Sequence, residues 1–223
     1  MKYPAPAFGL IGSPISHSLS PALFEAAYGG RMAYDLIETG SFEDAWTRFL
    51  ESYRAVNVTM PFKALAVART INRSEEVRAI GAANILVKTD LGVAAYNSDV
   101  MAVRSMLSGC PAGSKVAIIG SGGAGKAAQL AANSLFSRVF SRHHDEIAGG
   151  VSADVIIYTL PCAVPGYDKL DCDVLIEANY KNPCLEGHPG YISGKRWLLE
   201  QAICGFGLMT GEKPDVEAMK KVF

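Results

Sequence analysis

KVAIIGSGGAGKAAQLAA, residues 115–132, is the stretch of this sequence that decides the fold. An apolar run typical of a buried strand leads into a glycine-rich loop, and a helix-favouring segment follows. Glycines at these spacings let the backbone turn sharply and approach a pyrophosphate, which then meets N–H groups at the start of the helix. A merely tight strand-to-helix turn is the alternative. The order strand, loop, helix favours a dinucleotide site, and we expect it to use Gly120, Gly122, Gly123 and Gly125.

The residues after this loop indicate which dinucleotide is bound. Arg142 lies about twenty residues beyond Gly122, where an NAD-binding protein usually carries an acidic residue for the ribose hydroxyls. A guanidinium suits a 2′-phosphate instead, although Arg142 could also be a solvated surface cation. We therefore expect NADP rather than NAD, with Ser141 and Arg142 on the adenosine side.

The cofactor half is short. Only residues 143–153 separate Arg142 from the next apolar run at 154–159, whereas a crossover helix and a further strand need considerably more. One β-α unit is therefore expected to be absent, and NADP binding is expected to be weakened or altered.

The first half of the chain shows the same alternation of apolar runs and helical stretches. Strands are expected at 8–11, 34–38 and 55–58, and helices at 21–28 and 42–53, with Ser20 and Ser41 as their N-caps. This rhythm predicts a parallel or mixed sheet covered by helices. The fold class is therefore α/β with two domains. The first spans 1–98 and is completed by 199–223, and the second, spanning 99–198, is a shortened Rossmann-like domain.

Composition excludes several classes of function. The 223 residues carry 21 basic and 22 acidic side chains, a formal net charge of −1, so a nucleic-acid partner is not expected. We see neither an apolar run long enough to span a membrane nor the apolar core of a signal peptide, which predicts a cytoplasmic protein. The five scattered cysteines form no C-x-x-C pair, and no metal site is expected. Size and charge are compatible with a monomer or a homodimer.

Four polar clusters stand where strands or helices of the first half end. They are SHSLS at 16–20, NVTMPFK at 57–63, GAAN at 81–84 and YNSD at 96–99. In an open α/β sheet, ligands bind at the carboxyl ends of the strands, so these clusters could converge. Hydroxyls suit a carboxylate, amides suit alcohols, and a lysine with an aspartate suits proton transfer. The inventory predicts a site for a small, hydroxyl-rich anion.

These motifs, in their order along the chain, resemble the shikimate dehydrogenase family. The resemblance runs from about residue 8 to 214, and HSLSP together with NVTMPFK is its most specific part. It also includes NSD, GSGGAG, ANYKNP at 178–183, EQA at 200–202 and MTG at 209–211.

The resemblance implies a role for each matching residue. Ser18 and Ser20 would hold the substrate carboxylate, and Lys63 and Asp99 would be the catalytic pair. The residues implied around the substrate ring are Asn57, Thr59, Asn84 and Gln201, with Tyr180 between substrate and nicotinamide. The implied reaction is the NADP-dependent reversible reduction of 3-dehydroshikimate to shikimate.

Other functions stay open at this point. Quinate or a related acid would leave the fold and the catalytic pair unchanged. A shikimate-binding regulatory module would keep the substrate site but lack productive cofactor binding. An unrelated NADP-dependent reductase would not explain HSLSP and NVTMPFK together.

Overall fold

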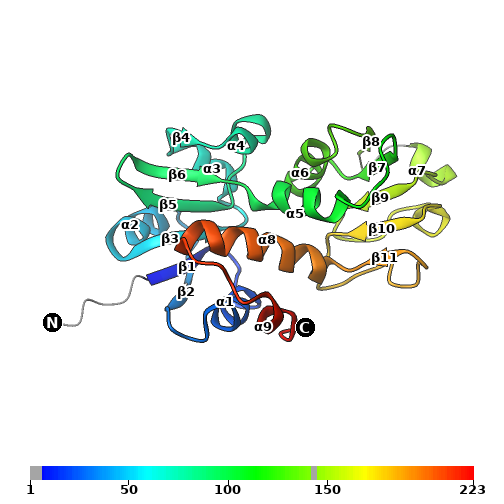
Figure 1. The fold of residues 1–223 in the computed structure, drawn as a ribbon. Helices are drawn as coiled ribbons and strands as arrows, with labels where there is room; N and C mark the ends of the chain where they lie inside the picture. Colours follow the sequence, from blue (N-terminus) through cyan, green and yellow to red (C-terminus); the bar gives the residue numbers. More distant parts are fainter. Residues whose placement is uncertain (1–6, 142–144) are drawn as a thin grey trace. The chain divides into compact units, whose positions relative to one another are not determined.

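The computed structural model describes residues 7–141 and 145–223, which form two compact units. Unit 1 runs to Ser98 and resumes with Gln201–Phe223, whereas unit 2 is Asp99–Glu200. The two boundaries fall inside helices, one in α5 (Ser98–Leu107) and one in α8 (Gly194–Thr210). Each unit has its own β-sheet with helices packed on it (Figure 1). The predicted two-domain α/β fold class is confirmed.

The sheet of unit 1 has the strand order β2-β1-β3-β5-β6-β4. Its strands are β1 (Ala7–Gly12), β2 (Tyr34–Glu38), β3 (Tyr53–Val58), β4 (Asn72–Arg73), β5 (Ile85–Thr89) and β6 (Gly92–Tyr96). The first three are parallel to one another, and β5 is antiparallel to both β3 and β6. The helices of this unit besides the end of α8 are α1 (Ser20–Tyr28), α2 (Phe42–Ser52), α3 (Lys63–Ala68), α4 (Glu75–Ile80) and α9 (Val216–Lys220).

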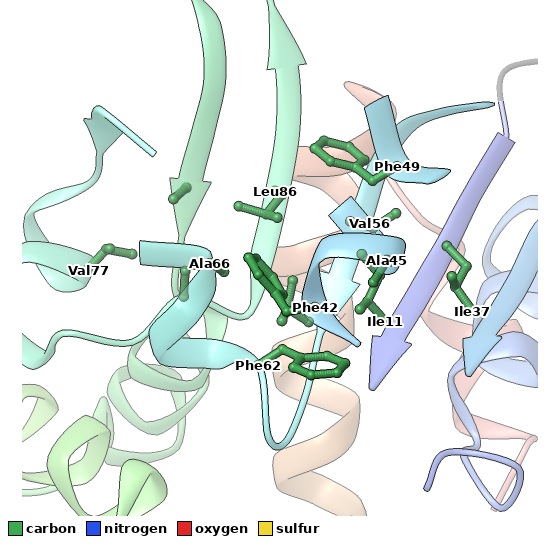
Figure 2. Packing of buried hydrophobic residues seen from close by; sticks show 13 residues of the cluster. Ile11, Ile37, Phe42, Ala45, Phe49, Val56, Phe62, Ala66, Val77 and Leu86 are labelled. Atoms are coloured by element: carbon green, nitrogen blue, oxygen red, sulfur yellow. The ribbon is translucent and has the colours of Figure 1, made fainter. Parts of the chain in front are cut away.

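One hydrophobic cluster fills the space between α2, α3 and the sheet of unit 1. Phe42 and Phe49 from α2 meet Ile11 and Leu86 from the strands, and Phe62 packs at the start of α3 (Figure 2). Each fully buried side chain of this size contributes about 1.5–3 kcal/mol of transfer free energy. The cluster thereby anchors the loop 57–63, which carries one of the polar motifs, to the sheet.

The two predicted N-caps have different outcomes. Ser41 caps α2 as predicted, since its side chain accepts a hydrogen bond from the Asp44 N–H at 3.3 Å. The prediction for Ser20 is wrong, because Ser20 is already the first residue of α1 and Leu19 occupies the N-cap position. Ser18 supplies the missing acceptor instead: its Oγ lies 3.2 Å from the Ser20 backbone nitrogen.

Helix α1 packs through aromatic side chains. The ring of Phe24 lies 4.7 Å from that of Tyr34 on β2 and 4.9 Å from that of Phe206 on α8. Tyr28 is also hydrogen-bonded to Thr210 through its hydroxyl at 2.8 Å. These contacts fix α1, β2 and the last turns of α8 against one another within unit 1.

Unit 2 contains a five-stranded parallel sheet in the order β11-β10-β9-β7-β8. The strands are β7 (Lys115–Ile119), β8 (Phe136–Phe140), β9 (Val155–Tyr158), β10 (Val174–Glu177) and β11 (Tyr191–Ile192). The remaining helices are α6 (Gly123–Ala131), α7 (Asp145–Gly149) and the 3₁₀ turn η1 (Tyr167–Lys169).

The sheet of unit 2 lacks one outer strand of a Rossmann sheet among the residues that the structure describes. The usual order is 3-2-1-4-5-6, and here β7 and β8 take positions 1 and 2 while β9 takes position 4. The connection from β8 to β9 carries only the five-residue α7, so β8 is an edge strand. Phe136 on this strand is 73% exposed, beside a cleft of about 520 Å³. The predicted shortening of this domain is confirmed.

No helix in the described part of the chain is long and apolar enough to cross a membrane.

Candidate active site

Three of the four polar clusters emerge at one edge of the unit 1 sheet. Strands β1 and β3 are parallel and both end there. Because β5 is antiparallel to β3 and β6, its first residue lies beside Asn57 and opposite Tyr96. The segments 57–63, 81–84 and 96–98 therefore meet at the carboxyl ends of the parallel strands, where α/β proteins bind ligands.

Asn84 is the centre of a buried hydrogen-bond network at this edge. Its Oδ1 accepts a hydrogen bond from the Ser98 backbone N–H at 2.8 Å. Its Nδ2 donates to Ser98 Oγ at 3.1 Å and to Gln201 Oε1 at 3.3 Å. Since Gln201 Oε1 is an acceptor here, its amide nitrogen is left as the donor for a ligand. The structure therefore brings together Asn84 and Gln201, residues far apart in the sequence.

A glycine on α8 permits this approach. A Cβ on Gly205 would lie 3.0 Å from Ile85 Cδ1 and 3.3 Å from Ser98 Oγ. These separations are shorter than ordinary van der Waals contacts. A larger residue at this position would push α8 away from β5 and from Ser98.

Asn57 is connected to the same network and to a residue that the sequence analysis did not single out. Its Nδ2 donates to the backbone carbonyl of Asn84 at 3.4 Å, and its Oδ1 accepts from the Tyr34 hydroxyl at 2.8 Å. Tyr34 opens strand β2 and belongs to none of the sequence motifs. Its place beside Asn57 arises from the order β2-β1-β3, which no local pattern reveals.

Thr59 and Lys63 occupy the loop between β3 and α3. The Thr59 N–H donates to the Ile11 carbonyl at 2.9 Å, and a Cβ on Gly12 would lie 2.3 Å from Thr59 Cγ2. The close approach of these two loops requires glycine at position 12. Lys63 is partly buried and begins α3, and its backbone carbonyl accepts the Ala83 N–H at 3.1 Å.

Ser18 and Ser20 present two partly buried hydroxyls at the start of α1. The Ser18 hydroxyl donates to Ser20 Oγ at 3.1 Å. Ser20 is the first residue of a nine-residue helix and Ser18 lies just before its N-cap, and the N-terminus of a helix favours a negative charge. The pair is chemically suited to a carboxylate.

The glycine loop of unit 2 has the geometry of a phosphate cradle. Gly120 has φ +112°, a conformation that favours glycine, and a Cβ on Gly125 would lie 2.0 Å from the Gly120 carbonyl oxygen. Around Gly122 and Gly123, by contrast, a Cβ would meet no atom within 4 Å. Gly122 is the N-cap of α6 and has no side chain to occupy the first N–H groups. The loop therefore fits a pyrophosphate.

Two residues, Ser141 and Arg142, are expected on the adenosine side of the cofactor. Ser141 directly follows β8 and is exposed. Arg142 lies outside the described residues.

Asp99 and Tyr180 are the two remaining predicted residues, both assigned to unit 2. Asp99 is 7% exposed and stands in the first turn of α5, where a carboxylate is favoured by the helix dipole. Tyr180 is partly buried in the loop after β10, and burial raises the pKa of its phenol.

The loop around Tyr180 is held by Asn179, which lies in the ANYKNP motif but was assigned no role, and by Glu177, which the sequence analysis missed. Asn179 Nδ2 donates to the carbonyls of Pro161 and Asn182, at 3.1 and 2.7 Å. Glu177 is fully buried and accepts hydrogen bonds from the Cys184 N–H and the Tyr191 hydroxyl, at 2.9 and 3.0 Å. The Pro161 contact joins the loops after β9 and β10, and the Tyr191 contact joins β10 to β11, so neither can be predicted from a local motif.

Within residues 7–141 and 145–223, no group of three or more histidine, cysteine or acidic side chains is arranged to hold a metal ion.

Comparison with known proteins places this arrangement in a family. A sequence profile of the shikimate dehydrogenase substrate binding domain matches residues 10–86. The shikimate dehydrogenase (NADP(+)) of Anaeromyxobacter sp. strain K is 31% identical over 221 residues, spanning 89% of this chain and 77% of the relative. The chain belongs to the shikimate dehydrogenase family. Another member, from Archaeoglobus fulgidus, is 32% identical over 155 residues, which cover 66% of this chain and 56% of that protein.

Solved structures of the shikimate dehydrogenase family share the fold. The Mycobacterium tuberculosis shikimate dehydrogenase matches with a TM-score of 0.83 at 30% identity, over 97% of this chain and 98% of that chain. The Thermus thermophilus shikimate 5-dehydrogenase, solved in complex with NADP(H) and shikimate, also gives a TM-score of 0.83. Its identity is 24%, over 97% of this chain and 98% of that chain, so this likeness concerns the fold.

Proposed function

We propose that this chain catalyses the NADP-dependent, reversible reduction of 3-dehydroshikimate to shikimate, a step of aromatic amino acid biosynthesis. The observation that carries the proposal is the hydrogen-bonded set formed by Asn57, Asn84, Ser98 and Gln201 at the carboxyl edge of the unit 1 sheet. Amides fixed in this way present donors in defined directions, as recognition of a polyhydroxylated ring requires. Unit 1 is accordingly assigned as the substrate domain and unit 2 as the dinucleotide domain.

The proposed carboxylate site is the pair Ser18 and Ser20. Two hydroxyl donors at a helix N-terminus offer a carboxylate two hydrogen bonds and a favourable dipole. Each hydroxyl can rotate from its partner toward the incoming anion. Asn57, Thr59, Asn84 and Gln201 are assigned to the ring hydroxyls.

The proposed NADP site is the loop 120–125, with Ser141 and Arg142 on the adenosine side. Gly122 and Gly123 leave open space for the pyrophosphate, and Gly120 and Gly125 allow the loop to pack closely on itself. When bound, NADPH supplies the hydride for the reduction. The names of relatives such as the Anaeromyxobacter enzyme support NADP over NAD.

Lys63 and Asp99 are proposed as the acid–base pair, and Tyr180 as a further substrate contact. As the ring ketone becomes an alcohol, negative charge develops on its oxygen and has to be neutralised by a proton. The Lys63 ammonium would donate that proton, and in the reverse direction its amine would accept it. Asp99, in the first turn of α5, would orient the lysine and the substrate hydroxyl.

One observation favours a second function. The outer strand of the dinucleotide sheet is absent among the described residues and α7 has only five residues. A binding module that keeps the substrate site but has lost productive use of NADP would have this construction.

The experiment that tests the proposal combines each substrate with each cofactor. The purified chain is mixed with shikimate or quinate and with NADP or NAD, and formation of reduced cofactor is followed by near-ultraviolet absorbance. We expect reduction to be fastest with shikimate and NADP. No reduction in any combination, together with a melting temperature raised by shikimate, would favour the binding module. Equal rates with NADP and NAD would remove the role proposed for Arg142.

A further inference from the structure

Tyr34 places a partly buried hydroxyl between the two parts of the proposed substrate site. Its ring packs against Phe24 and Phe206, with centroids 4.7 and 5.9 Å away, so the side chain is held from both sides. Its hydroxyl donates to Asn57 Oδ1 at 2.8 Å. Burial raises the pKa of this phenol, although hydrogen bonding with Ser20 acts in the opposite direction. The hydroxyl therefore stays protonated and remains a donor at physiological pH.

The direction of this hydrogen bond fixes the Asn57 amide. A tyrosine hydroxyl that donates needs an acceptor, so the amide oxygen must face Tyr34 and the amide nitrogen must face away. The nitrogen carries two hydrogens, and one of them points to the Asn84 carbonyl at 3.4 Å. The second is the hydrogen that Asn57 can offer to a ligand. Without the phenol, the amide could turn by half a rotation and present its oxygen instead.

The same phenol also reaches the proposed carboxylate site. The Ser20 side chain lies close enough to the Tyr34 phenol to lower its pKa in part, and the Ser18 hydroxyl donates to Ser20 Oγ at 3.1 Å. Tyr34 therefore lies between Asn57, to which it is hydrogen-bonded, and the serine pair of the proposed carboxylate site.

We infer that Tyr34 is a positioning residue of the substrate site, which holds Asn57 as a hydrogen-bond donor toward a substrate hydroxyl. This inference rests on the proposed function. Tyr34 itself donates to Asn57, and it acts on the substrate through that amide. Its ring supplies packing, whereas its hydroxyl supplies the positioning, so the two contributions can be separated.

Tyr34→Phe tests the inference because it removes the hydroxyl and keeps the ring packed between Phe24 and Phe206. We expect KM for shikimate to rise about tenfold, which corresponds to about 1.4 kcal/mol and to the net value of one buried hydrogen bond. KM for NADP and kcat are expected to stay within about twofold, since loss of uniform binding raises KM alone.

Tyr53→Phe is the matched control. Tyr53 lies on β3 of the same sheet, and its hydroxyl bonds to Asp35 Oδ2 at 3.0 Å on an exposed surface. Removing it takes away a comparable tyrosine hydrogen bond from the same unit. We expect its KM for shikimate to match that of the wild type.

A double-mutant cycle distinguishes positioning from a general loss of structure. In the Asn57→Ala background, Tyr34→Phe should add little to KM, because the amide it orients is already gone. Asn57→Asp is a second, independent variant: its carboxylate can still accept from Tyr34 but has no N–H, so its KM should rise at least as much as that of Tyr34→Phe.

Three outcomes would overturn the inference while the proposed function stands. They are an unchanged KM in Tyr34→Phe, a rise in KM of the same size in Tyr53→Phe, and full additivity of Tyr34→Phe with Asn57→Ala. A wild-type chain without any response to shikimate, in turnover or in melting temperature, would overturn the proposed function and the inference with it.

Discussion

The glycine loop combines close packing against α6 with open space for the NADP pyrophosphate, and replacing Gly125 with alanine tests the packing. The new Cβ would lie 2.0 Å from the Gly120 carbonyl oxygen and 2.7 Å from its carbon. Both are backbone atoms, so α6 must shift by about 1.5 Å to restore ordinary contact. Overpacking of this kind costs about 2–3 kcal/mol. At about 2–4 °C per kcal/mol for a chain of this size, the melting temperature should fall by about 4–12 °C.

Gly122→Ala is the control for this prediction. Its Cβ meets no atom within 4 Å, and its φ of −72° suits alanine. We expect the melting temperature to fall by no more than about 4 °C, since alanine is a poorer N-cap residue than glycine by up to about 1 kcal/mol. Its methyl group, however, stands where the pyrophosphate would approach, so KM for NADP should rise about tenfold or more.

Differential scanning fluorimetry measures the melting temperatures of the two variants, and steady-state kinetics measures their KM for NADP. An unchanged melting temperature in Gly125→Ala would refute the argument from close approach of α6 to Gly120. A wild-type KM for NADP in Gly122→Ala would show that the phosphates do not lie over this part of the loop.

Other sites in both units give three further predictions. Glu177→Ala should lower the free energy of unfolding in urea by about 2–4 kcal/mol. The reason is that the Cys184 N–H and the Tyr191 hydroxyl lose their acceptor. A change below about 1 kcal/mol would contradict this. Burial raises the pKa of the Cys184 thiol from 9.0 to about 11, so the unfolded chain releases the proton first. The free energy of unfolding should therefore fall as pH rises from about 9 to about 11, and fall less steeply in Cys184→Ala; equal slopes would disprove the contribution. Gly205→Ala should raise KM for shikimate severalfold by displacing Ser98. The free energy of unfolding should change by less than about 1 kcal/mol, because alanine favours the helix. An unchanged KM would argue against this contact.

Much of the fold could be predicted from local pattern. The strands at 34–38 and 115–119 have the expected bounds, because each is a short β-type run between turn residues. A serine before acidic first-turn residues predicts the cap at Ser41, and the structure confirms it. The cap predicted at Ser20 is wrong by one helical position, since α1 begins before Pro21. Local pattern locates a helix but does not fix its first residue.

The candidate site could be predicted only in part, for a physical reason. Glycine spacing and the polar clusters are local motifs, so they predict contacts only between residues that are close in the sequence. Tyr34 contacts Asn57 because β1 lies between their strands, which makes the contact a property of sheet order. The pairing of Asn84 with Gln201 likewise depends on the return of α8 to unit 1.

The most direct test of the account is the turnover number of Lys63→Ala beside that of the wild type, with shikimate and NADP at saturation. We predict a loss of about 10²–10⁴-fold, as expected for removal of a general acid–base group. The melting temperature and the shikimate-induced shift should stay close to those of the wild type. A variant that turns over shikimate at the wild-type rate would contradict the proposed mechanism.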